Sequence, residues 1–348
     1  MFAPDVLKIF ALTTLSFLIA MLWTPFLVKF LRERKMGKQI RDASQTPIYS
    51  ELHQKKAGTP TMGGILIWVT VAFLAVLFYC LDKFLGLGFA RFLNFLTRPQ
   101  TLLPLGALVA SAIVGLVDDY LNVRRIGKNG GGLRMWHRLL IYAAIAIVGA
   151  LWFYFKLDWD LFHIPFVGDF NVGLWYIPIF IIIIVSTAFS VNEADGLDGL
   201  AGGTLMAAFG AYGAIAFVQG KIELAAFCGV IMGALLAFLW FNIYPAKFFM
   251  GDTGAMSLGV VLGIIAMLTN TALFLPFICS VFVLESVSVI VQILSKKIRG
   301  KKIFLSSPIH HHLEAKGWQE PNIVMRFWVI AGVSAVIGVI LALLDKSL

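Results

Sequence analysis

The stretch that decides the fold is IPIFIIIIVSTAFS, residues 177–190, which runs directly into VNEADGLDGLAGG, residues 191–203. The first part is almost entirely apolar and approaches the length of a bilayer-spanning helix, about 20 residues. The second part brings three carboxylates, Glu193, Asp195 and Asp198, within six residues. An apolar chain has no structural need for such a cluster at this point, so its purpose depends on where it lies relative to a membrane.

The composition extends the membrane interpretation to the whole chain. Of 348 residues, 59% are hydrophobic and 14% are charged, with a mean hydropathy of +0.88, whereas a soluble domain carries roughly 25% charged residues. The net charge of +9 is better explained by basic cytoplasmic loops than by nucleic-acid binding. We therefore expect an all-α, polytopic membrane protein that lies in a lipid bilayer, binds no nucleic acid, and forms a single domain over residues 1–348.

Long apolar runs predict about ten transmembrane helices. The eighth and ninth runs are separated only by TNTALFLP, residues 269–276. The ten runs cover residues 5–31, 61–81, 101–118, 136–155, 174–191, 199–218, 222–241, 254–270, 275–295 and 323–344.

The distribution of basic residues orients these spans. The connections after odd-numbered spans hold 19 Lys and Arg residues, and the connections after even-numbered spans hold five. Because basic loops stay in the cytoplasm, the odd-numbered connections are predicted to be cytoplasmic. Both termini are then expected on the outer, periplasmic side.

Five polar stretches interrupt the apolar pattern, and all of them fall at connections predicted to be cytoplasmic. A transporter would instead place its ionisable groups near the bilayer midplane, on broken helices. A cytoplasmic-face cleft formed by five loops is typical of an enzyme that takes one substrate from water and another from lipid. The stretches are KKAGTPTMGG (55–64), VDDYLNVRR (117–125), NEADGLDGL (192–200), FNIYPAKFFMGDTG (241–254) and SPIHHHLEAKGW (307–318).

Acidic residues mark three predicted helix ends on this face. Asp118 and Asp119 repel each other and belong naturally near a cation, although such a pair can also simply end a span at the interface. Asp195 and Asp198 would share a face if they lay on a helix, and Asp198 and Asp252 could each be only an N-cap. Three such ends on one face indicate a site for Mg²⁺ and phosphate, because Mg²⁺ prefers carboxylate and phosphate oxygens.

The run of three histidines, residues 310–312, is predicted to lie on a short surface helix between Pro308 and Gly317. Consecutive helical residues fan out by about 100°, so the three side chains cannot all bind one metal ion. They suit contacts with several oxygens of an extended anionic substrate. The alternative is a polar interfacial helix without a role in binding.

Glu285 is the carboxylate that hydropathy places inside a span. Unpaired in hydrocarbon it would cost several kcal/mol, so it is expected to face protein or a water-filled cleft, or to be protonated. Ser286, Ser288 and Gln292 extend it into a polar stripe that we expect to face the cleft. Since no Lys or Arg lies at that depth, its predicted partners are backbone amides or Ser and Thr hydroxyls.

The five stretches, in this order, resemble the motifs of the phospho-N-acetylmuramoyl-pentapeptide transferase family, within the polyprenyl-phosphate sugar-1-phosphate transferase (glycosyltransferase 4 type) superfamily. The acidic motifs are shared across that superfamily, and TPTMGG and HHH point to this branch. The family commonly has Asn-Leu-Thr-Asp-Gly-Leu-Asp where residues 192–198 are Asn-Glu-Ala-Asp-Gly-Leu-Asp. The Asn and both Asp residues are present, and Glu193 receives no role.

The resemblance implies a reaction in which undecaprenyl phosphate and UDP-N-acetylmuramoyl-pentapeptide give lipid I and UMP, with Mg²⁺ as cofactor. It places the enzyme in the bacterial inner membrane, with its active site facing the cytoplasm, and implies a homodimer. Two rivals are a sister transferase that uses UDP-N-acetylglucosamine, which the HHH element disfavours, and a flippase or transporter of lipid-linked sugars.

Roles for individual residues also follow from the resemblance. Asp252 would be catalytic and bind Mg²⁺, and Asp118, with Asp119 beside it, would accept the proton of the lipid phosphate or help to hold the metal and phosphates. Direct attack by the lipid phosphate and a phospho-enzyme on Asp118 both stay open. The implied uridine pocket consists of Lys56, Thr61, Asn192, Asp195 and Asp198, with Phe249 stacking on uracil, and Gly196 and Leu197 are further implied substrate-binding residues. The implied contacts to phosphate, sugar or pentapeptide are Asn242, Gln292, His310, His311 and His312.

Overall fold

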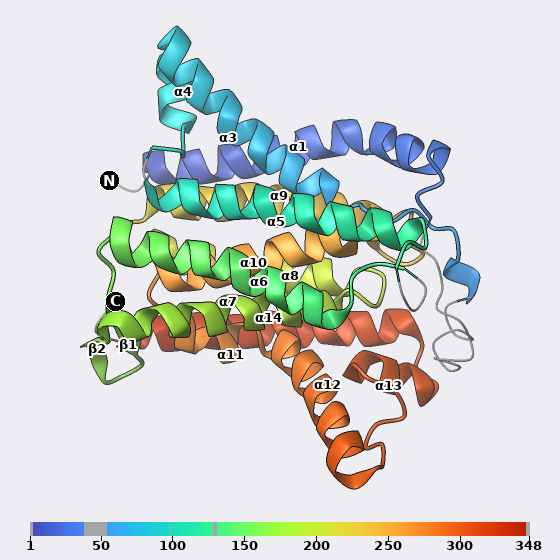
Figure 1. Cartoon of the computed structure of the whole chain (residues 1–348). Coiled ribbons are helices and arrows are strands. Elements are labelled where there is room, and N and C mark those ends of the chain that lie inside the picture. The colour runs from blue at the N-terminus through green and yellow to red at the C-terminus, as the bar shows by residue number, and fades with distance from the viewer. Residues whose placement is uncertain (1–2, 38–53, 98, 128–130, 346–348) are drawn as a thin grey trace.

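Helices make up most of the chain in the computed structural model, which describes residues 3–37, 54–97, 99–127 and 131–345. Figure 1 shows them packed side by side as one bundle, with both chain termini at the same end. The helices are α1 (Ala3–Glu33), α3 (Ile65–Leu85), α4 (Gly88–Leu93), α5 (Pro99–Val123), α6 (Met135–Leu151), α7 (Tyr176–Ala194), α8 (Leu200–Val218), α9 (Ile222–Asn242), α10 (Gly251–Leu268), α11 (Leu275–Ile278), α12 (Ser280–Arg299), α13 (Ile309–Ala315) and α14 (Glu320–Leu344).

The helices differ strongly in how much of their surface is enclosed. In the most apolar part of α10, 89% of the residues are buried, against 22% in α1 and 28% in α14. Alanine and glycine recur along α8, α9 and α10, and small residues let helix backbones approach closely. Large apolar side chains such as Phe26, Leu22 and Val329 are exposed on the outer helices. This pattern is that of a bundle surrounded by lipid.

Within the described residues, nine helices are long and apolar enough to cross a membrane, and a bent pair brings the number to ten if it is one span. The prediction of about ten spans is therefore confirmed. The expectation of one continuous span over residues 275–295 is wrong, because 272–278 and α12 meet at an angle of 89°. Cys279 leaves the helical conformation between them (φ −112°, ψ 34°), and hydropathy does not detect a turn inside an apolar run. In Figure 1, α12 projects away from the bundle.

A β-hairpin between α6 and α7 is a second departure, since the fold was expected to be all-α. Its antiparallel strands β1 (Leu161–Ile164) and β2 (Gly168–Asn171) pair Phe162 with Phe170. Phe166, in the turn between them, has positive φ (62°), as does Gly168 (127°), the first residue of β2. Four-residue strands are too short to register in a search for runs of about 20 apolar residues. The hairpin lies at the end of the bundle that holds both termini (Figure 1).

Candidate active site

The N-terminus of α10 is capped by a carboxylate from another helix. Asp119, near the end of α5, accepts the backbone N–H groups of Asp252 and Thr253, each at 3.0 Å. Gly251 permits this approach, because its φ is +73° and a Cβ there would lie 2.5 Å from Asp119 Oδ2. Asp252 is thus more than an N-cap, since Asp119 supplies the cap and the Asp252 side chain makes other contacts.

Arg138, in the first turn of α6, lies at the centre of those contacts. Its guanidinium pairs with Asp118 Oδ2 at 2.7 Å and with Asp252 Oδ2 at 2.8 Å, and it donates to Asn192 Oδ1 at 3.2 Å. Asn192 in turn donates to Asp252 Oδ1 at 2.5 Å. The ends of α5 and α7 therefore meet the starts of α6 and α10, and we call Asp118, Asp119, Arg138, Asn192 and Asp252 the carboxylate cluster.

Two carboxylates of this cluster, Asp118 and Asp252, pair with one guanidinium. The described residues contain no group of three His, Cys, Asp or Glu side chains arranged to hold a metal ion. Mg²⁺, however, is usually bound by one or two carboxylates together with substrate phosphates, not by an all-protein cage. Asp118 and Asp252 fit that arrangement, since both point to one place and carry hard oxygen donors.

Residues 195–199 form a turn between α7 and α8, so the expectation that Asp195 and Asp198 share a helix face is wrong. Asp195 Oδ2 accepts the N–H of Gly251 at 3.0 Å, which ties this turn to the start of α10. Asp198 accepts Lys56 Nζ at 2.6 Å and the N–H of Ala246 at 3.0 Å. It is not the N-cap of α8, because that position belongs to Gly199.

Lys56 connects this turn to the start of α14. Besides Asp198, its ammonium pairs with Glu320, whose Oε1 also accepts the N–H of Asp198 at 2.7 Å. The same Nζ lies 5.8 Å from the centroid of the Phe249 ring. Thr61 is buried beside them, and a Cβ on Gly251 would lie 2.9 Å from its Oγ1. We call Lys56, Asp198, Phe249 and Glu320 the lysine cluster.

Asn242 and Gln292, two residues predicted to bind substrate, connect loops through hydrogen bonds. Asn242 donates to Phe248 O at 2.8 Å and accepts the N–H of Gly199 at 3.0 Å. Gln292 donates to Phe304 O at 2.8 Å and accepts the N–H groups of Ile303 and Phe304, both at 3.0 Å. Both side chains are buried. The structure therefore brings neither into the carboxylate cluster.

The three histidines contact three different partners, as the predicted fan of side chains requires. His310 Nδ1 meets Glu285 Oε2 at 2.8 Å, and His311 Nδ1 meets Glu314 Oε2 at 2.7 Å. His312 Nδ1 accepts the N–H of Leu305 at 3.1 Å. Pro308 precedes the short helix α13 and Gly317, with φ +91°, follows it, so the predicted helix is confirmed.

Glu285 faces protein, as predicted, and is fully buried together with the neighbouring Ser286, Ser288 and Gln292. The prediction of its partner is wrong, because the carboxylate meets the ring of His310 and not a hydroxyl or backbone amide. His310 lies outside the predicted spans, so hydropathy gives it no depth that matches Glu285. The loop after α12 returns to it and brings α13 alongside, which hydropathy does not describe.

Comparison with known proteins assigns the family. Residues 101–270 match glycosyl transferase family 4, and residues 56–67 match phospho-N-acetylmuramoyl-pentapeptide-transferase signature 1. A phospho-N-acetylmuramoyl-pentapeptide-transferase from Chloroflexus aurantiacus is 39% identical to this chain, over 98% of this chain and 91% of its own length. Those from Shouchella clausii (40% identical; 93% and 94% covered) and Bacillus subtilis (37%; 93% and 95%) are also similar. The chain belongs to the phospho-N-acetylmuramoyl-pentapeptide-transferase family.

The resemblance seen in the five motifs is thereby confirmed. As a member of this family, the protein is a multi-pass membrane transferase of peptidoglycan synthesis. The two matched ranges contain most of the residues described above: 56–67 includes Lys56 and Thr61, and 101–270 runs from α5 through α10. The carboxylate cluster therefore lies within the part of the chain that the transferase family shares.

Two residues of the carboxylate and lysine clusters, Arg138 and Glu320, were missed from sequence. Arg138 was counted only among the basic residues that orient the spans, although it stands at the boundary between a polar loop and an apolar run. Glu320 directly precedes Pro321 at the start of α14, a position that marks a helix N-terminus without revealing a partner. Neither signal indicates which carboxylate or ammonium group the side chain meets.

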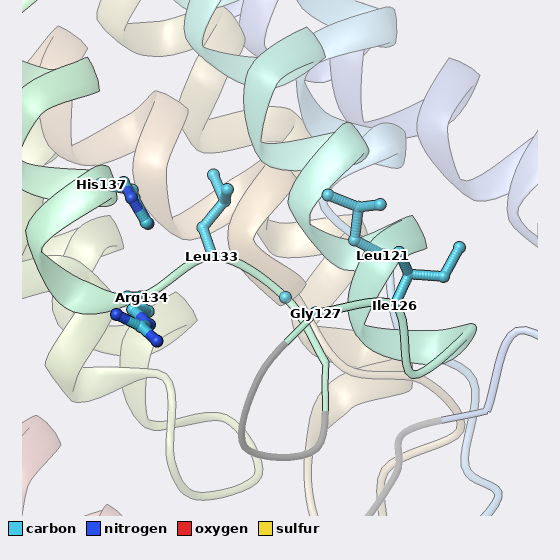
Figure 2. A pocket seen from close by; sticks show the side chains of 7 residues that line it. Leu121, Ile126, Gly127, Leu133, Arg134 and His137 are labelled. Carbon is cyan, nitrogen blue, oxygen red and sulfur yellow. The ribbon is translucent and has the colours of Figure 1, made fainter.

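A cavity of about 430 Å³ opens beside the carboxylate cluster, where α5 ends and α6 begins. Figure 2 shows its side chains grouped around the connection between these helices. It is bounded by Leu121, Ile126, Gly127, Gly132, Leu133, Arg134 and His137. Leu133 also donates its backbone N–H to Asp118 Oδ1 at 2.5 Å. The transferase thus has a mainly apolar cavity with two basic side chains next to Asp118.

Proposed function

We propose that this transferase uses UDP-N-acetylmuramoyl-pentapeptide as donor and undecaprenyl phosphate as acceptor, and forms lipid I and UMP with Mg²⁺ as cofactor. The observation that carries the proposal is the carboxylate cluster, in which Arg138 pairs with both Asp118 and Asp252. Phosphoryl transfer is catalysed mainly by positioning and by neutralising charge. A cluster of fixed anions and a cation beside a second, lysine-centred cluster supports that chemistry.

The lysine cluster suits the uridine nucleotide of the donor. The Phe249 ring offers a face on which uracil can stack, and base–aromatic stacking is worth roughly 1–3 kcal/mol. Asp195 and Asp198 supply acceptors for donor groups of uracil and ribose, and Lys56 supplies positive charge for phosphate. Thr61 and Asn192 border this region. The histidine element of α13 favours the muramoyl-pentapeptide donor over UDP-N-acetylglucosamine.

Asp252 and Asp118 would hold Mg²⁺ jointly with the phosphates of the substrates. The bound ion would neutralise phosphate charge so that two anionic substrates can approach each other. Asp119 supports the site by fixing the start of α10, where Asp252 lies. Arg138 holds the two carboxylates in position and contributes the protein's own positive charge.

The cavity beside Asp118 suits the head of the acceptor lipid. Its leucines and isoleucine would contact the first isoprene units, while Arg134 and His137 would face the phosphate. Asp118 would accept the proton of that phosphate. A phosphate oxygen then attacks the sugar-proximal phosphorus of the donor, and the bond to UMP breaks with its electron pair leaving on UMP.

Direct attack by the lipid phosphate is favoured over a phospho-enzyme on Asp118. Both oxygens of this carboxylate are engaged, Oδ2 with Arg138 and Oδ1 with the N–H of Leu133. The side chain is also 3% exposed. Such a carboxylate is better placed to take a proton and balance charge than to swing towards a phosphorus atom.

We further propose that the site faces the cytoplasm of a bacterium and that both termini are periplasmic. The basic loops support this orientation, and the termini lie with the hairpin at the end of the bundle away from α13 (Figure 1). The 348 residues would form one domain in the inner membrane, and two copies would form a homodimer.

The proposal is tested by measuring UMP release from the purified full chain in detergent while one component at a time is omitted. We expect UMP only when UDP-N-acetylmuramoyl-pentapeptide, undecaprenyl phosphate and Mg²⁺ are all present, and little with UDP-N-acetylglucosamine. UMP release without lipid would establish the phospho-enzyme route instead. No UMP from the complete mixture would refute a transferase and favour a flippase.

A further inference from the structure

Glu285 and His310 form a fully buried pair outside the carboxylate and lysine clusters. The Glu285 carboxylate on α12 and the His310 ring on α13 are both 0% exposed, and Oε2 lies 2.8 Å from Nδ1. A buried carboxylate without a partner is costly, so this contact accounts for a carboxylate that is fully buried on α12. The pair joins α12 to the surface helix α13.

The charge environment favours the protonated ring. Burial alone would lower the pKa of His310, but the Glu285 carboxylate raises it, and the net shift is above the ordinary value. Glu314 and Glu193 act in the same direction from greater distance. The His311 ring lies 4.1 Å from the His310 ring, centroid to centroid. The contact with Glu285 therefore orients this imidazole.

The other edge of the His310 ring lies against the turn that follows α7. A Cβ added to Gly196 would lie 2.2 Å from His310 Nε2 and 2.8 Å from Cε1, so only a glycine leaves room for the ring. Among the described residues, no group forms a hydrogen bond with His310 Nε2 or with Glu285 Oε1. The ring is held from one side by Glu285 and packs directly on the backbone of Gly196.

Gly196 stands next to Asp195 and two residues from Asp198, whose contacts define the proposed nucleotide site. Asp195 accepts the N–H of Gly251 at 3.0 Å, and Asp198 accepts Lys56 Nζ at 2.6 Å. A displacement of the turn would therefore move both carboxylates relative to α10 and to the lysine cluster. The His310 ring supports this turn on the α13 side, beside the apolar packing of Leu197 with Ile309 and Leu313.

We propose that Glu285 is a positioning residue for nucleotide binding: it holds the His310 ring against Gly196, and this support keeps Asp195 and Asp198 in the geometry that receives a uridine nucleotide. The inference rests on the proposed function and adds to it a residue at the far side of the turn. Glu285 itself contacts neither substrate nor reacting atoms. Its effect passes through His310.

The first test compares Glu285→Gln with Glu285→Leu in the purified full chain. Gln keeps an acceptor for His310 Nδ1, so the KM for UDP-N-acetylmuramoyl-pentapeptide should stay within about 3-fold of wild type. Leu removes the acceptor; loss of the carboxylate that orients a metal-binding histidine typically costs roughly 10- to 100-fold, and we take the same range for this oriented His310. We expect that rise in KM and in the Kd for UMP, with a much smaller change in kcat, because nucleotide contacts act in ground and transition state alike.

Ser288→Ala is the matched control. Ser288 is buried on the same helix three residues away, and its hydroxyl donates only to the backbone O of Glu285 at 2.7 Å. Its removal perturbs α12 without touching the His310 ring, so KM and Kd should be unchanged. A Glu285→Leu protein that is folded and binds UMP with wild-type Kd would overturn the inference, as would a Gln variant as impaired as Leu.

The second test asks whether His310 acts through Gly196. Gly196→Ala should weaken UMP binding, because the added methyl overlaps the ring. The double variant Gly196→Ala with His310→Ala should raise the Kd for UMP about as much as His310→Ala alone, since mutations of residues in contact are not additive. If the two separate increases in the Kd for UMP multiplied in the double variant, His310 would not act through the turn. Wild-type protein that binds UMP but releases none from substrates would refute the proposed reaction and leave this inference standing.

Discussion

Two buried histidines at opposite ends of the molecule differ in how completely they are bonded. At the hairpin end, His163 Nδ1 meets Asp169 at 2.9 Å and Nε2 meets Asp345 at 2.8 Å. At the other end, His310 meets Glu285 through Nδ1, and within the described chain its Nε2 has no hydrogen-bond partner. Figure 1 places β1 and β2 beside both termini, and α13 at the far end.

The difference distinguishes a contact that stabilises the fold from a binding site. A buried polar atom left without a partner costs roughly 1–3 kcal/mol, so unsatisfied atoms are expected where a binding site, and not stability alone, sets the arrangement. At the hairpin end, Phe166 also donates its N–H to Asp345 Oδ2 at 2.9 Å, and the network ties β1 to the residue that follows α14. At the other end, Asp118 and Asp252 share the single guanidinium of Arg138.

The largest contrast is expected between Asp118→Asn and Asp345→Asn. Asp118→Asn keeps shape but weakens the pair with Arg138 and removes the proton acceptor, so UMP release should fall by at least about 100-fold, more than removal of an orienting group typically costs. Asp345→Asn lies at the opposite end and should keep turnover within about 2-fold of wild type, a change of roughly 0.4 kcal/mol. Both variants are purified in the same detergent and assayed side by side. Equal losses of UMP release in the two would show that the carboxylate cluster and the hairpin end do not differ in function.

Phe249→Ala should have the next largest effect. Stacking on uracil acts about equally in ground and transition state, so its loss raises KM and spares kcat. A stacking contribution of roughly 1–3 kcal/mol corresponds to a rise in KM of about 5- to 150-fold. Steady-state kinetics with varied donor concentration measures this. A large fall in kcat at unchanged KM would place Phe249 outside the nucleotide site.

The sequence predicted the spans and the end of the bundle at which the polar stretches lie, because hydropathy and basic loops depend on local composition. It did not predict the partners, because these depend on how helices pack. Lys56 is 142 residues from Asp198 and 264 residues from Glu320 along the chain, and no periodicity connects such positions. The same holds for Arg138, because its position at a loop boundary does not indicate that it pairs with Asp118 and Asp252.

Where a prediction failed, a short local turn was responsible. The bend at Cys279 and the hairpin after α6 both lie inside or beside apolar runs, where a window of about 20 residues averages over them. Residues 195–199 turn at once after α7, so Asp195 and Asp198 do not share a helix face. Glu285 was correctly placed in protein, but its partner comes from a helix that folds back after α12.

A smaller effect, on stability, is expected at the hairpin end. Asp345→Asn removes charge from a buried carboxylate that accepts from both His163 and Phe166. We expect a loss of about 1–3 kcal/mol in the free energy of unfolding, seen as a lower thermal midpoint in detergent. Unchanged stability with lost turnover would assign Asp345 to the reaction and reverse the comparison.

The smallest expected effect is a pH dependence of the hairpin. Burial lowers the pKa of His163, but hydrogen bonds to Asp345 and Asp169 raise it by more than burial lowers it. The folded-state pKa therefore lies above the ordinary value of 6.5. The ion pairs are then fully present below pH 6.5 and are lost as the pH rises through the folded-state pKa. Hydrogen-exchange protection of residues 161–171 should fall over that range, and His163→Gln should flatten the profile.

Turnover of Asp252→Asn at limiting Mg²⁺ tests the central claim most directly. The change keeps size and deletes the charge that a hard cation requires, while Asn192 and Arg138 remain in place to hold the side chain. Measured as UMP release over a Mg²⁺ titration, with thermal unfolding to show that the protein is folded, activity should be nearly abolished and only weakly restored by excess Mg²⁺. Near-normal turnover at limiting Mg²⁺ would contradict the assignment of this cluster as the metal-dependent active site.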